Sequence, residues 1–463
     1  MHLMQRIWRA IPISLLASSL AVLSLGSPGL ASWPHTWGGS SDDNVSSVAL
    51  DPNGNVYIAG STTSFGAGGT DVLILKYSPS GTLRWAKTWG GGGDEAATRI
   101  ALGPDGYIYV TGGTGSFGAG WDDIFLLKLN SNGDLQWGLT WGGSSHEYGY
   151  DLNFDQAGNI YVVGESYSNG NSAVILKFSP DGGPPIWSAS WKGPATYETG
   201  YALAVDSNFN VIMAGTSWDY GGPYLHNYIL LVKYDSSGNY LWSENWITAS
   251  PGQDQAILGS TTDSAGNIYV VGDHSGNCPS SNFSNCNNFQ AIVLKVDAGG
   301  SLAWAQTWGG AGFDMATGMA LDPNGHLLVA VGKNRYGATP GVAVLSYDTG
   351  GGLLSSVGWA GQEPFARAPD PGLAVDAAGD ALVVAGAQNN SGKWAAVAGS
   401  VRSLPNSLVI NPFTLGTPTG QVTMLTNPTV SRTGVTDTGG GGTDVFVAKY
   451  SHLLSGGYFL PPR

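Results

Sequence analysis

The sequence predicts an all-β protein, a β-propeller of four-stranded antiparallel blades, and three observations support this fold class. Trp-Gly-Gly or a weaker copy returns at separations of 52, 52, 50, 55, 62 and 51 residues, at Trp37, Trp89, Trp141, Trp191, Trp246, Trp308 and Trp359. A fixed period near fifty residues is typical of stacked supersecondary units. Within a period, four short apolar runs alternate with glycine-rich turns, which is the pattern of one propeller blade.

The first full unit shows each expected strand in order. Residues 45–50 and 55–60 are the first two strands, joined by the turn that begins at Asp51. Residues 72–77, VLILKY, form a third strand whose near-continuous apolar run predicts burial on both faces. The fourth strand alternates up to Trp89, and the glycines that follow turn the chain toward the next unit.

The two ends of the chain predict how the propeller closes. The seventh unit is degenerate, with a poor third strand at 394–401 and a candidate fourth strand at 407–413. Residues 435–450 copy the second-to-third strand passage of a good unit, and residues 33–37 resemble a fourth strand that lacks the preceding three. We therefore expect eight blades, the last one closed by the N-terminal strand. Seven blades is the alternative count, if residues 403–428 are only a linker or the degenerate unit is absorbed.

The repeat is similar to a known one. Trp-Gly-Gly, an acid near Asp94, LDPNGNVYIAG and DVLILKYSPSG together resemble the SBBP β-propeller repeat of bacteria and archaea, over about residues 33–451. The resemblance implies an extracytoplasmic propeller that serves as a module of cell-surface or secreted proteins. It offers no catalytic residue to transfer onto this chain. The chain departs from the pattern at Ser346, where other units have lysine, and near Ser355, where the fourth-strand tryptophan is missing.

The N-terminus has the features of a secretory signal peptide. Arg6 and Arg9 precede an apolar run at 11–25, and small residues around Ala31 suit cleavage there. We expect a signal at 1–31, with a retained anchor as the alternative, then one propeller domain at 32–454 and a short tail at 455–463. No other run is long enough to cross a bilayer. The expected location is secreted or cell surface.

The net charge indicates which partners to exclude, and the two cysteines predict a disulfide. The net charge of −14 becomes −16 once the two arginines of the signal are removed, which argues against nucleic acid and anionic membranes as partners. In an exported protein, Cys278 and Cys286 are predicted to form a disulfide within one loop. We expect a monomer.

Two polar positions recur in the units. A carboxylate follows the repeat tryptophan by six residues, at Asp43, Glu95, Glu147 and Asp314. These acids lie on the crossings, the connections that lead from one blade to the next. They are predicted to cap backbone N–H groups of their own crossing or to pair with the third-strand lysines. The alternative is that they form a rim on one face that binds calcium or a basic partner. The lysines, which we expect in structural ion pairs, are Lys76, Lys128, Lys177, Lys233, Lys295 and Lys449. No cofactor is predicted, with calcium as the alternative.

The aromatic residues fall into two groups. Tryptophans on the fourth strands recur regularly, which indicates packing between blades. Off-pattern aromatics in the loops between second and third strands are candidate contacts for a protein or glycan ligand. They include Trp121, Tyr167, Trp218, Tyr220 and Tyr224.

The motif search predicts no catalytic residue. HExxH, GxSxG and Walker patterns are absent from the sequence. The first interpretation is an exported, non-enzymatic binding or scaffold module. One alternative is a quinone (PQQ)-dependent dehydrogenase-like propeller, which the Gly-x-x-x-Trp spacing from Gly81 to Trp85 faintly resembles. Another is a glycan-binding or glycan-cleaving propeller, of which the cleaving form needs paired carboxylates.

Overall fold

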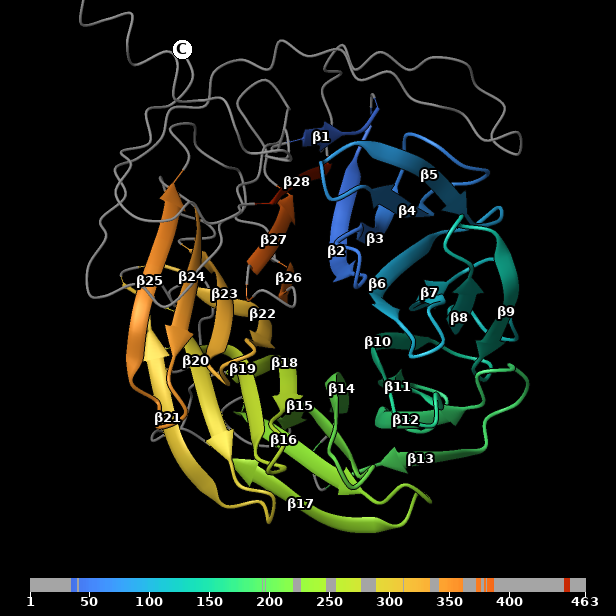
Figure 1. Ribbon diagram of the computed structural model, residues 1–463. Coiled ribbons are helices and arrows are strands. Elements are labelled where there is room, and N and C mark those ends of the chain that lie inside the picture. The colour runs from blue at the N-terminus through green and yellow to red at the C-terminus, as the bar shows by residue number, and fades with distance from the viewer. Residues whose placement is uncertain are drawn as a thin grey trace, which may run out of the picture.

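The computed structural model describes residues 35–39, 41–193, 195, 197–219, 226–246, 255–275, 289–310, 312–333, 341–360, 372–375, 379, 381–386 and 445–449. Over these residues, four-stranded antiparallel sheets are arranged as a ring (Figure 1). The all-β propeller class is confirmed. The predicted signal peptide, the C-terminal tail, the two cysteines, Tyr220 and Tyr224 lie outside the described residues.

Six blades are each built from four consecutive strands. The first has β2 (Asp43–Leu50), β3 (Val56–Thr62), β4 (Asp71–Tyr77) and β5 (Leu83–Trp89); the second has β6 (Glu95–Leu102), β7 (Ile108–Thr114), β8 (Asp123–Leu129) and β9 (Leu135–Trp141). The third has β10 (Glu147–Phe154), β11 (Ile160–Ser166), β12 (Ser172–Phe178) and β13 (Trp187–Trp191); the fourth has β14 (Tyr197–Val205), β15 (Val211–Asp219), β16 (His226–Tyr234) and β17 (Tyr240–Trp246). The fifth has β18 (Gln255–Thr262), β19 (Ile268–Ser275), β20 (Phe289–Val296) and β21 (Leu302–Trp308); the sixth has β22 (Met315–Leu321), β23 (Leu327–Lys333), β24 (Gly341–Tyr347) and β25 (Leu353–Ala360).

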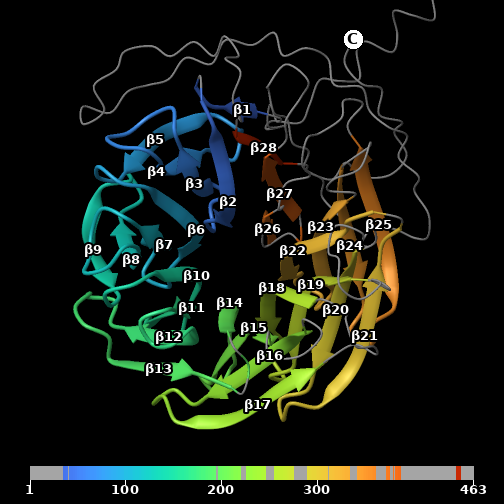
Figure 2. The same ribbon diagram turned by 180° about the vertical axis from the view of Figure 1, so that it is seen from behind.

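A further sheet combines strands from both ends of the chain. Its order is β1 (His35–Trp37), β28 (Val445–Lys449), β27 (Ala381–Gly386) and β26 (Gly372–Val375). β1 is antiparallel to β28, with Trp37 opposite Val445. Both views place β1 beside β28 and near the first blade (Figures 1 and 2). β26 contacts β2 on one side and β22 on the other.

The expectation of eight blades is wrong for the part of the chain that the structure describes. β27 pairs directly with β28, so two partial units that the sequence analysis counted separately contribute strands to one sheet. The segment VFVAK at Val445–Lys449 takes the third-strand position beside β27. The expected strands at 394–401 and 407–413 lie outside the described residues.

The hydrophobic core lies between blades. All seven side chains of β8 and of β12 are buried, which confirms the prediction of third strands covered on both faces. One buried cluster joins Ile74 and Trp85 of the first blade to Ile108 and Phe125 of the second. Each such side chain contributes about 1.5–3 kcal/mol when it is fully buried. A blade is therefore stabilised mainly by its neighbours.

The glycine at the end of the motif VYIAG is required by a close approach of two strands. The first strand of the blade has a bulge between Val45 and Ser47, beside Gly60 on the second strand. A Cβ added to Gly60 would lie 1.8 Å from the carbonyl oxygen of Asn44. The equivalent glycines of four other blades meet the same obstacle within 1.8–1.9 Å, at Gly112, Gly164, Gly215 and Gly272.

We predict that Gly60→Ala lowers the free energy of unfolding by about 3 kcal/mol, because the backbone of one strand must move to admit the methyl group. Urea denaturation of the full chain measures the loss. The control is Gly92→Ala, because nothing lies within 4 Å of a Cβ at that position. Equal midpoints for the two variants would contradict the prediction.

Candidate functional site

The recurring crossing carboxylates lie inside the fold. Asp43, Glu95, Glu147 and Asp314 are 0%, 1%, 0% and 2% exposed. Each accepts a hydrogen bond from the N–H of the glycine four residues earlier, at 2.6–2.7 Å. In the first three blades the other carboxylate oxygen accepts a hydrogen bond from the hydroxyl that ends the second strand, on Thr62, Thr114 and Ser166. These hydrogen bonds are the ones that the capping interpretation predicts, and they tie each crossing to its own blade.

Burial affects the protonation of one of these acids. It raises the pKa of Asp43, against the opposing effect of the hydrogen bonds from Thr62, Gly39 and Ser64.

Within the ranges that the structure describes, no three His, Cys, Asp or Glu side chains are grouped so that they could hold a metal ion.

The third-strand lysines connect neighbouring blades. Lys233 Nζ lies 2.9 Å from Asp206 Oδ2 in its own blade and donates to the carbonyl oxygen of Ala298 in the next blade at 3.1 Å. Lys128 repeats this with Asp105 at 2.8 Å and the carbonyl oxygen of Pro180 at 2.9 Å. The acid in each pair belongs to the turn between the first and second strands. The alternative in which these lysines pair with the crossing acids is wrong for these two blades.

The Gly-x-x-x-Trp spacing also has a packing role. Trp85 Nε1 donates to the carbonyl oxygen of Ser131 in the next blade at 3.3 Å. A Cβ added to Gly133, in the same turn as Ser131, would lie 3.1 Å from the Trp85 indole. Trp187 and Gly238 repeat the arrangement between the third and fourth blades. The tryptophan of one blade therefore docks on the glycine turn of the next.

Equivalent positions can be compared across blades, because β2, β6 and β10 begin 52 residues apart at Asp43, Glu95 and Glu147. Five neighbouring positions between the second and third blades depart from the pattern of the preceding pair. We call them the blade 2–3 cluster: Trp121, Asp122, His146, Tyr148 and Tyr167. The residues that stand 52 positions earlier are Gly69, Thr70, Asp94, Ala96 and Gly115.

Backbone hydrogen bonds hold the blade 2–3 cluster together. Asp122 and His146 form a parallel bridge between the loop before β8 and the crossing before β10. Trp121 N donates to the carbonyl oxygen of Ser145 at 2.9 Å. Tyr167 N donates to the carbonyl oxygen of His146 at 3.0 Å. Three separate segments of the chain are thereby fixed against one another.

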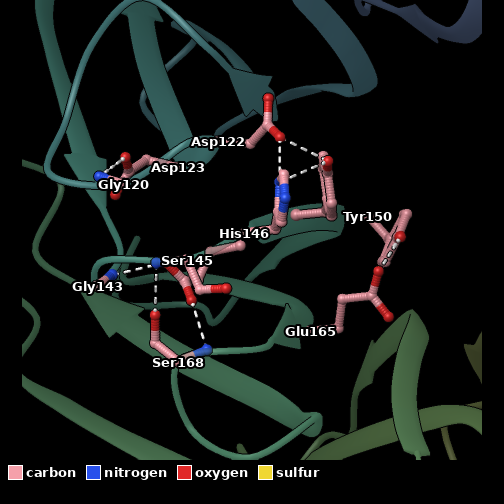
Figure 3. Close-up of polar contacts among 11 residues, drawn as sticks. Gly120, Asp122, Asp123, Gly143, Ser145, His146, Tyr150, Glu165 and Ser168 are labelled. Atoms are coloured by element: carbon pink, nitrogen blue, oxygen red, sulfur yellow. Dashed lines mark hydrogen bonds and ion pairs between the residues drawn. The ribbon is translucent and has the colours of Figure 1, made fainter.

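Two side chains of the cluster, His146 and Tyr148, contact one carboxylate oxygen of a third, Asp122, as Figure 3 shows for His146. His146 Nδ1 lies 2.5 Å from Asp122 Oδ2, and the Tyr148 hydroxyl donates to the same oxygen at 2.7 Å. Burial raises the pKa of Tyr148, and the hydrogen bond to Asp122 and the charge of that carboxylate raise it further. Tyr148 therefore stays a donor at neutral pH.

Two aromatic members of the cluster are open to solvent. Trp121 is 74% exposed and Tyr167 is 39% exposed. The indole of Trp121 stands at 85° to the ring of His146, with 5.0 Å between centroids. The ring centroids of Tyr167 and Tyr197 are 6.3 Å apart. Tyr197 on β14 lies opposite Trp218 on β15. Aromatic side chains thus extend from the second blade to the fourth.

A second polar group lies beside the cluster (Figure 3). The Tyr150 hydroxyl donates to Glu165 Oε1 at 2.7 Å, and Thr199 Oγ1 donates to Glu165 Oε2 at 2.8 Å. Both oxygens of Glu165 are therefore engaged by the third and fourth blades, and Tyr201 packs on Tyr150 with 4.9 Å between ring centroids. The hydrogen bonds of Glu165 therefore join the third blade to the fourth.

A cavity of about 230 Å³ lies among the turns between first and second strands of the third, fourth and fifth blades. Its acidic lining residues are Asp155, Asp206 and Asp263. Each of them forms an ion pair with the third-strand lysine of its own blade, at 3.6, 2.9 and 3.9 Å. These carboxylates are therefore already neutralised by the fold.

Part of the blade 2–3 cluster could be predicted from the sequence. Trp121 and Tyr167 are off-pattern loop aromatics, as expected, whereas Trp218 lies on β15 rather than in a loop. Asp122, His146 and Tyr148, which lie at a strand edge and on a crossing, were not predicted. A position-by-position comparison of the units, at the 52-residue offset, would have marked all five as departures from the repeat.

Comparison with known proteins supports the repeat assignment. Residues 36–66 match the model of the SBBP beta-propeller repeat. An uncharacterized WD repeat-containing protein of Acanthamoeba polyphaga mimivirus is 22% identical over 350 residues, which are 62% of this chain and 24% of the relative. Regulatory protein FlaEY of Caulobacter vibrioides is 28% identical over 151 residues, which are 30% of this chain and 15% of the relative. The matches therefore span about a quarter or less of these curated relatives.

Comparison with solved structures finds similar chains at low identity. An ulvan lyase, which is a polysaccharide lyase, is 11% identical with a TM-score of 0.48, over 76% of this chain and 93% of that one. A puromycin hydrolase is 12% identical with a TM-score of 0.45, over 76% of this chain and 51% of that one. A protein of unknown function from Dyadobacter fermentans is 11% identical with a TM-score of 0.45, over 81% of this chain and 99% of that one.

The described residues hold no helix that is long and apolar enough to span a membrane. Their four-stranded blades agree with the matched repeat. The chain carries an SBBP beta-propeller repeat at residues 36–66, as its sequence resemblance predicted.

Proposed function

We propose that this chain is an exported, non-enzymatic binding module that contacts its partner through the blade 2–3 cluster. One observation carries the proposal: Trp121 is 74% exposed within a cluster whose five members all depart from the preceding blade pair. Residues that recur from blade to blade serve the fold, as the buried crossing acids do. A large exposed aromatic at a position where the fold accepts glycine is best explained by binding.

The arrangement around the cluster suits recognition. Binding residues commonly lie on loops that a rigid scaffold positions. Here the loop that carries Trp121 is bridged to the crossing that carries His146, and the blades beneath are packed on both sides. The partner would meet a surface whose geometry is set before binding, which reduces the entropy lost on association.

The proposal can be tested with the full chain and its Trp121→Gly/Tyr167→Gly variant. Both substitutions restore the residue that the preceding blade pair carries, so folding should be retained. Co-sedimentation with bacterial cell envelopes, cellulose and chitin measures binding. We expect the variant to bind at least about tenfold more weakly to whichever surface retains the wild type.

A matched control separates the cluster from general surface hydrophobicity. Tyr240 on β17 is 52% exposed and lies on the outer strand of the fourth blade. Tyr240→Ser should bind like the wild type. If the double variant also binds like the wild type on every surface that retains the chain, the proposed function is wrong.

We also propose that the chain is a monomeric propeller domain at 32–454, closed by its N-terminal strand, and that it is exported by a signal at residues 1–31 that is then cleaved. The pairing of β1 with β28 and the burial of Trp37, which is 4% exposed, support the closure. The charged start and apolar run of the N-terminus support export to the cell surface or medium. N-terminal sequencing of the exported protein should begin at Ser32; an uncleaved Met1 would contradict the cleavage.

A further inference from the structure

We infer that the blade 2–3 cluster binds a neutral glycan, with Trp121 as the platform on which a pyranose ring stacks and Asp122 as the acceptor for its hydroxyl groups. This inference rests on the proposed function and names the ligand class of the same site. It depends on three features of the cluster: a fixed exposed indole, an oriented carboxylate, and a charge pattern that disfavours other ligands.

The platform is Trp121. Its backbone N–H is held by Ser145, and the His146 ring meets its indole at 85° with 5.0 Å between centroids. The indole is thus supported on one side while 74% of the residue remains exposed. Aromatic rings combine a large apolar surface with little conformational freedom. A flat indole held in this way suits the C–H face of a sugar ring.

The acceptor is the carboxylate of Asp122. His146 and Tyr148 both contact Oδ2, which fixes the plane of the group. The other oxygen points away from His146 (Figure 3), and the Asp122 side chain is 24% exposed. Hydrogen bonds to a charged acceptor are stronger than those between neutral groups. A sugar stacked on Trp121 could donate hydroxyl protons to this oxygen.

The charges of the cluster select among ligands. Its five residues include one carboxylate and no lysine or arginine, and the whole chain carries a net charge of −14. A polyanionic glycan would be repelled by the carboxylate of Asp122 and would find no lysine or arginine within the cluster. A neutral glycan meets neither penalty.

The packing of the rings argues against a quaternary ammonium ligand. An aromatic cage for such a cation needs open space between ring faces. In this cluster the His146 ring fills the middle, with its centroid 5.0 Å from Trp121, 6.0 Å from Tyr148 and 6.1 Å from Tyr167. The ligand therefore lies on the cluster rather than inside it.

Affinity gel electrophoresis of the full chain tests the inference. Separate native gels contain hydroxyethylcellulose, xyloglucan or galactomannan as neutral glycans, and alginate or polygalacturonate as anionic ones. We expect retardation in at least one neutral gel and in neither anionic gel. Trp121→Gly and Asp122→Thr should each weaken this retardation by about tenfold or more, while Tyr240→Ser leaves it unchanged.

The outcomes separate the ligand class from the proposed function. Retardation by anionic glycans alone, or by none, would overturn the neutral-glycan inference. If the Trp121→Gly/Tyr167→Gly variant still loses envelope binding in that case, the binding role of the cluster stands with another ligand class. Retardation in a neutral gel that survives both Trp121→Gly and Asp122→Thr would also overturn the assignment of the glycan to this cluster.

Discussion

Replacing Asp206 by alanine should lower the free energy of unfolding by about 3–5 kcal/mol, because it leaves the ammonium of Lys233 buried without its counter-charge. The Lys233 and Asp206 side chains are 5% and 1% exposed and lie 2.9 Å apart. The same carboxylate accepts the N–H groups of Asn208 and Asn210, each at 2.9 Å, so the turn also loses its organising acceptor. Urea denaturation measures the loss.

The matched control for this variant is Asp235→Ala. Asp235 organises an equivalent turn, accepting the N–H groups of Ser237 and Asn239 at 2.9 Å. It belongs to the turn between the third and fourth strands. Its hydrogen bonds come from groups of that turn, and among the described residues it forms no ion pair with a lysine. The free energy of unfolding should therefore fall much less in Asp235→Ala than in Asp206→Ala. Adding Lys233→Met to Asp206→Ala should restore part of the stability, because the unpaired charge is then gone; equal losses in both alanine variants would refute the ion-pair account.

The contribution of Asp206 should depend on pH in a defined direction. Burial acts to raise the pKa of Asp206, but hydrogen bonds from Asn210 and Lys233 outweigh it, so the pKa is lowered in the folded state. A carboxylate with a lowered folded pKa stabilises the protein above its unfolded pKa of about 3.9, and this contribution is lost as the pH falls through the folded value. The stability difference between the wild type and Asp206→Asn should therefore shrink below about pH 4.

Most of the blade architecture could be predicted from the sequence because it depends on local patterns. The alternation of strands and turns, the burial of third strands, and the turns organised by aspartate all follow from residues close together in the chain. The Asp51 turn, for example, has the expected bonds from the N–H groups of Asn53 and Asn55. The blade count could not be obtained in this way, because β27 pairs with β28 across residues 387–444.

The lysine partners show how strand register decides a contact. Lys76 lies opposite Tyr57, near the start of the second strand. That end of the blade carries the turn of Asp51, whereas the crossing acids lie at the opposite end of the strands. The antiparallel order of the strands therefore excludes a crossing acid as the partner. The same strand order predicts the turn aspartates as the partners of the lysines.

The candidate site could be predicted only in part, for a related reason. An exposed tryptophan in a loop is visible in the sequence, and Trp121 was found. Asp122 and His146 are 24 residues apart and meet through a parallel bridge between a loop and a crossing. Such a bridge has no local sequence pattern, so its members become visible only when neighbouring blades are compared.

Trp37→Ala should destabilise the protein by about 3–5 kcal/mol, as expected for removal of a buried tryptophan. Trp37 is 4% exposed and belongs to one buried cluster with Leu75 of the first blade and Leu382 of β27. Its ring lies 5.2 Å from that of Phe65. Because β1 has three residues, this side chain is the main apolar contribution of the strand to the fold. Urea denaturation of the full chain gives the size of the effect.

The comparison with Trp89→Ala distinguishes closure of the ring from ordinary packing. Trp89 stands 52 residues later and contacts Phe117 at the same 5.2 Å, but it ends a strand of a blade built from consecutive segments. Loss of Trp37 should speed amide hydrogen exchange in β26 and β27, whereas loss of Trp89 should speed exchange only in the first and second blades. If β1 closes the ring, the two variants must differ in this way. Unchanged exchange in β26 and β27 after Trp37→Ala would show that the N-terminal strand does not hold the last sheet in place.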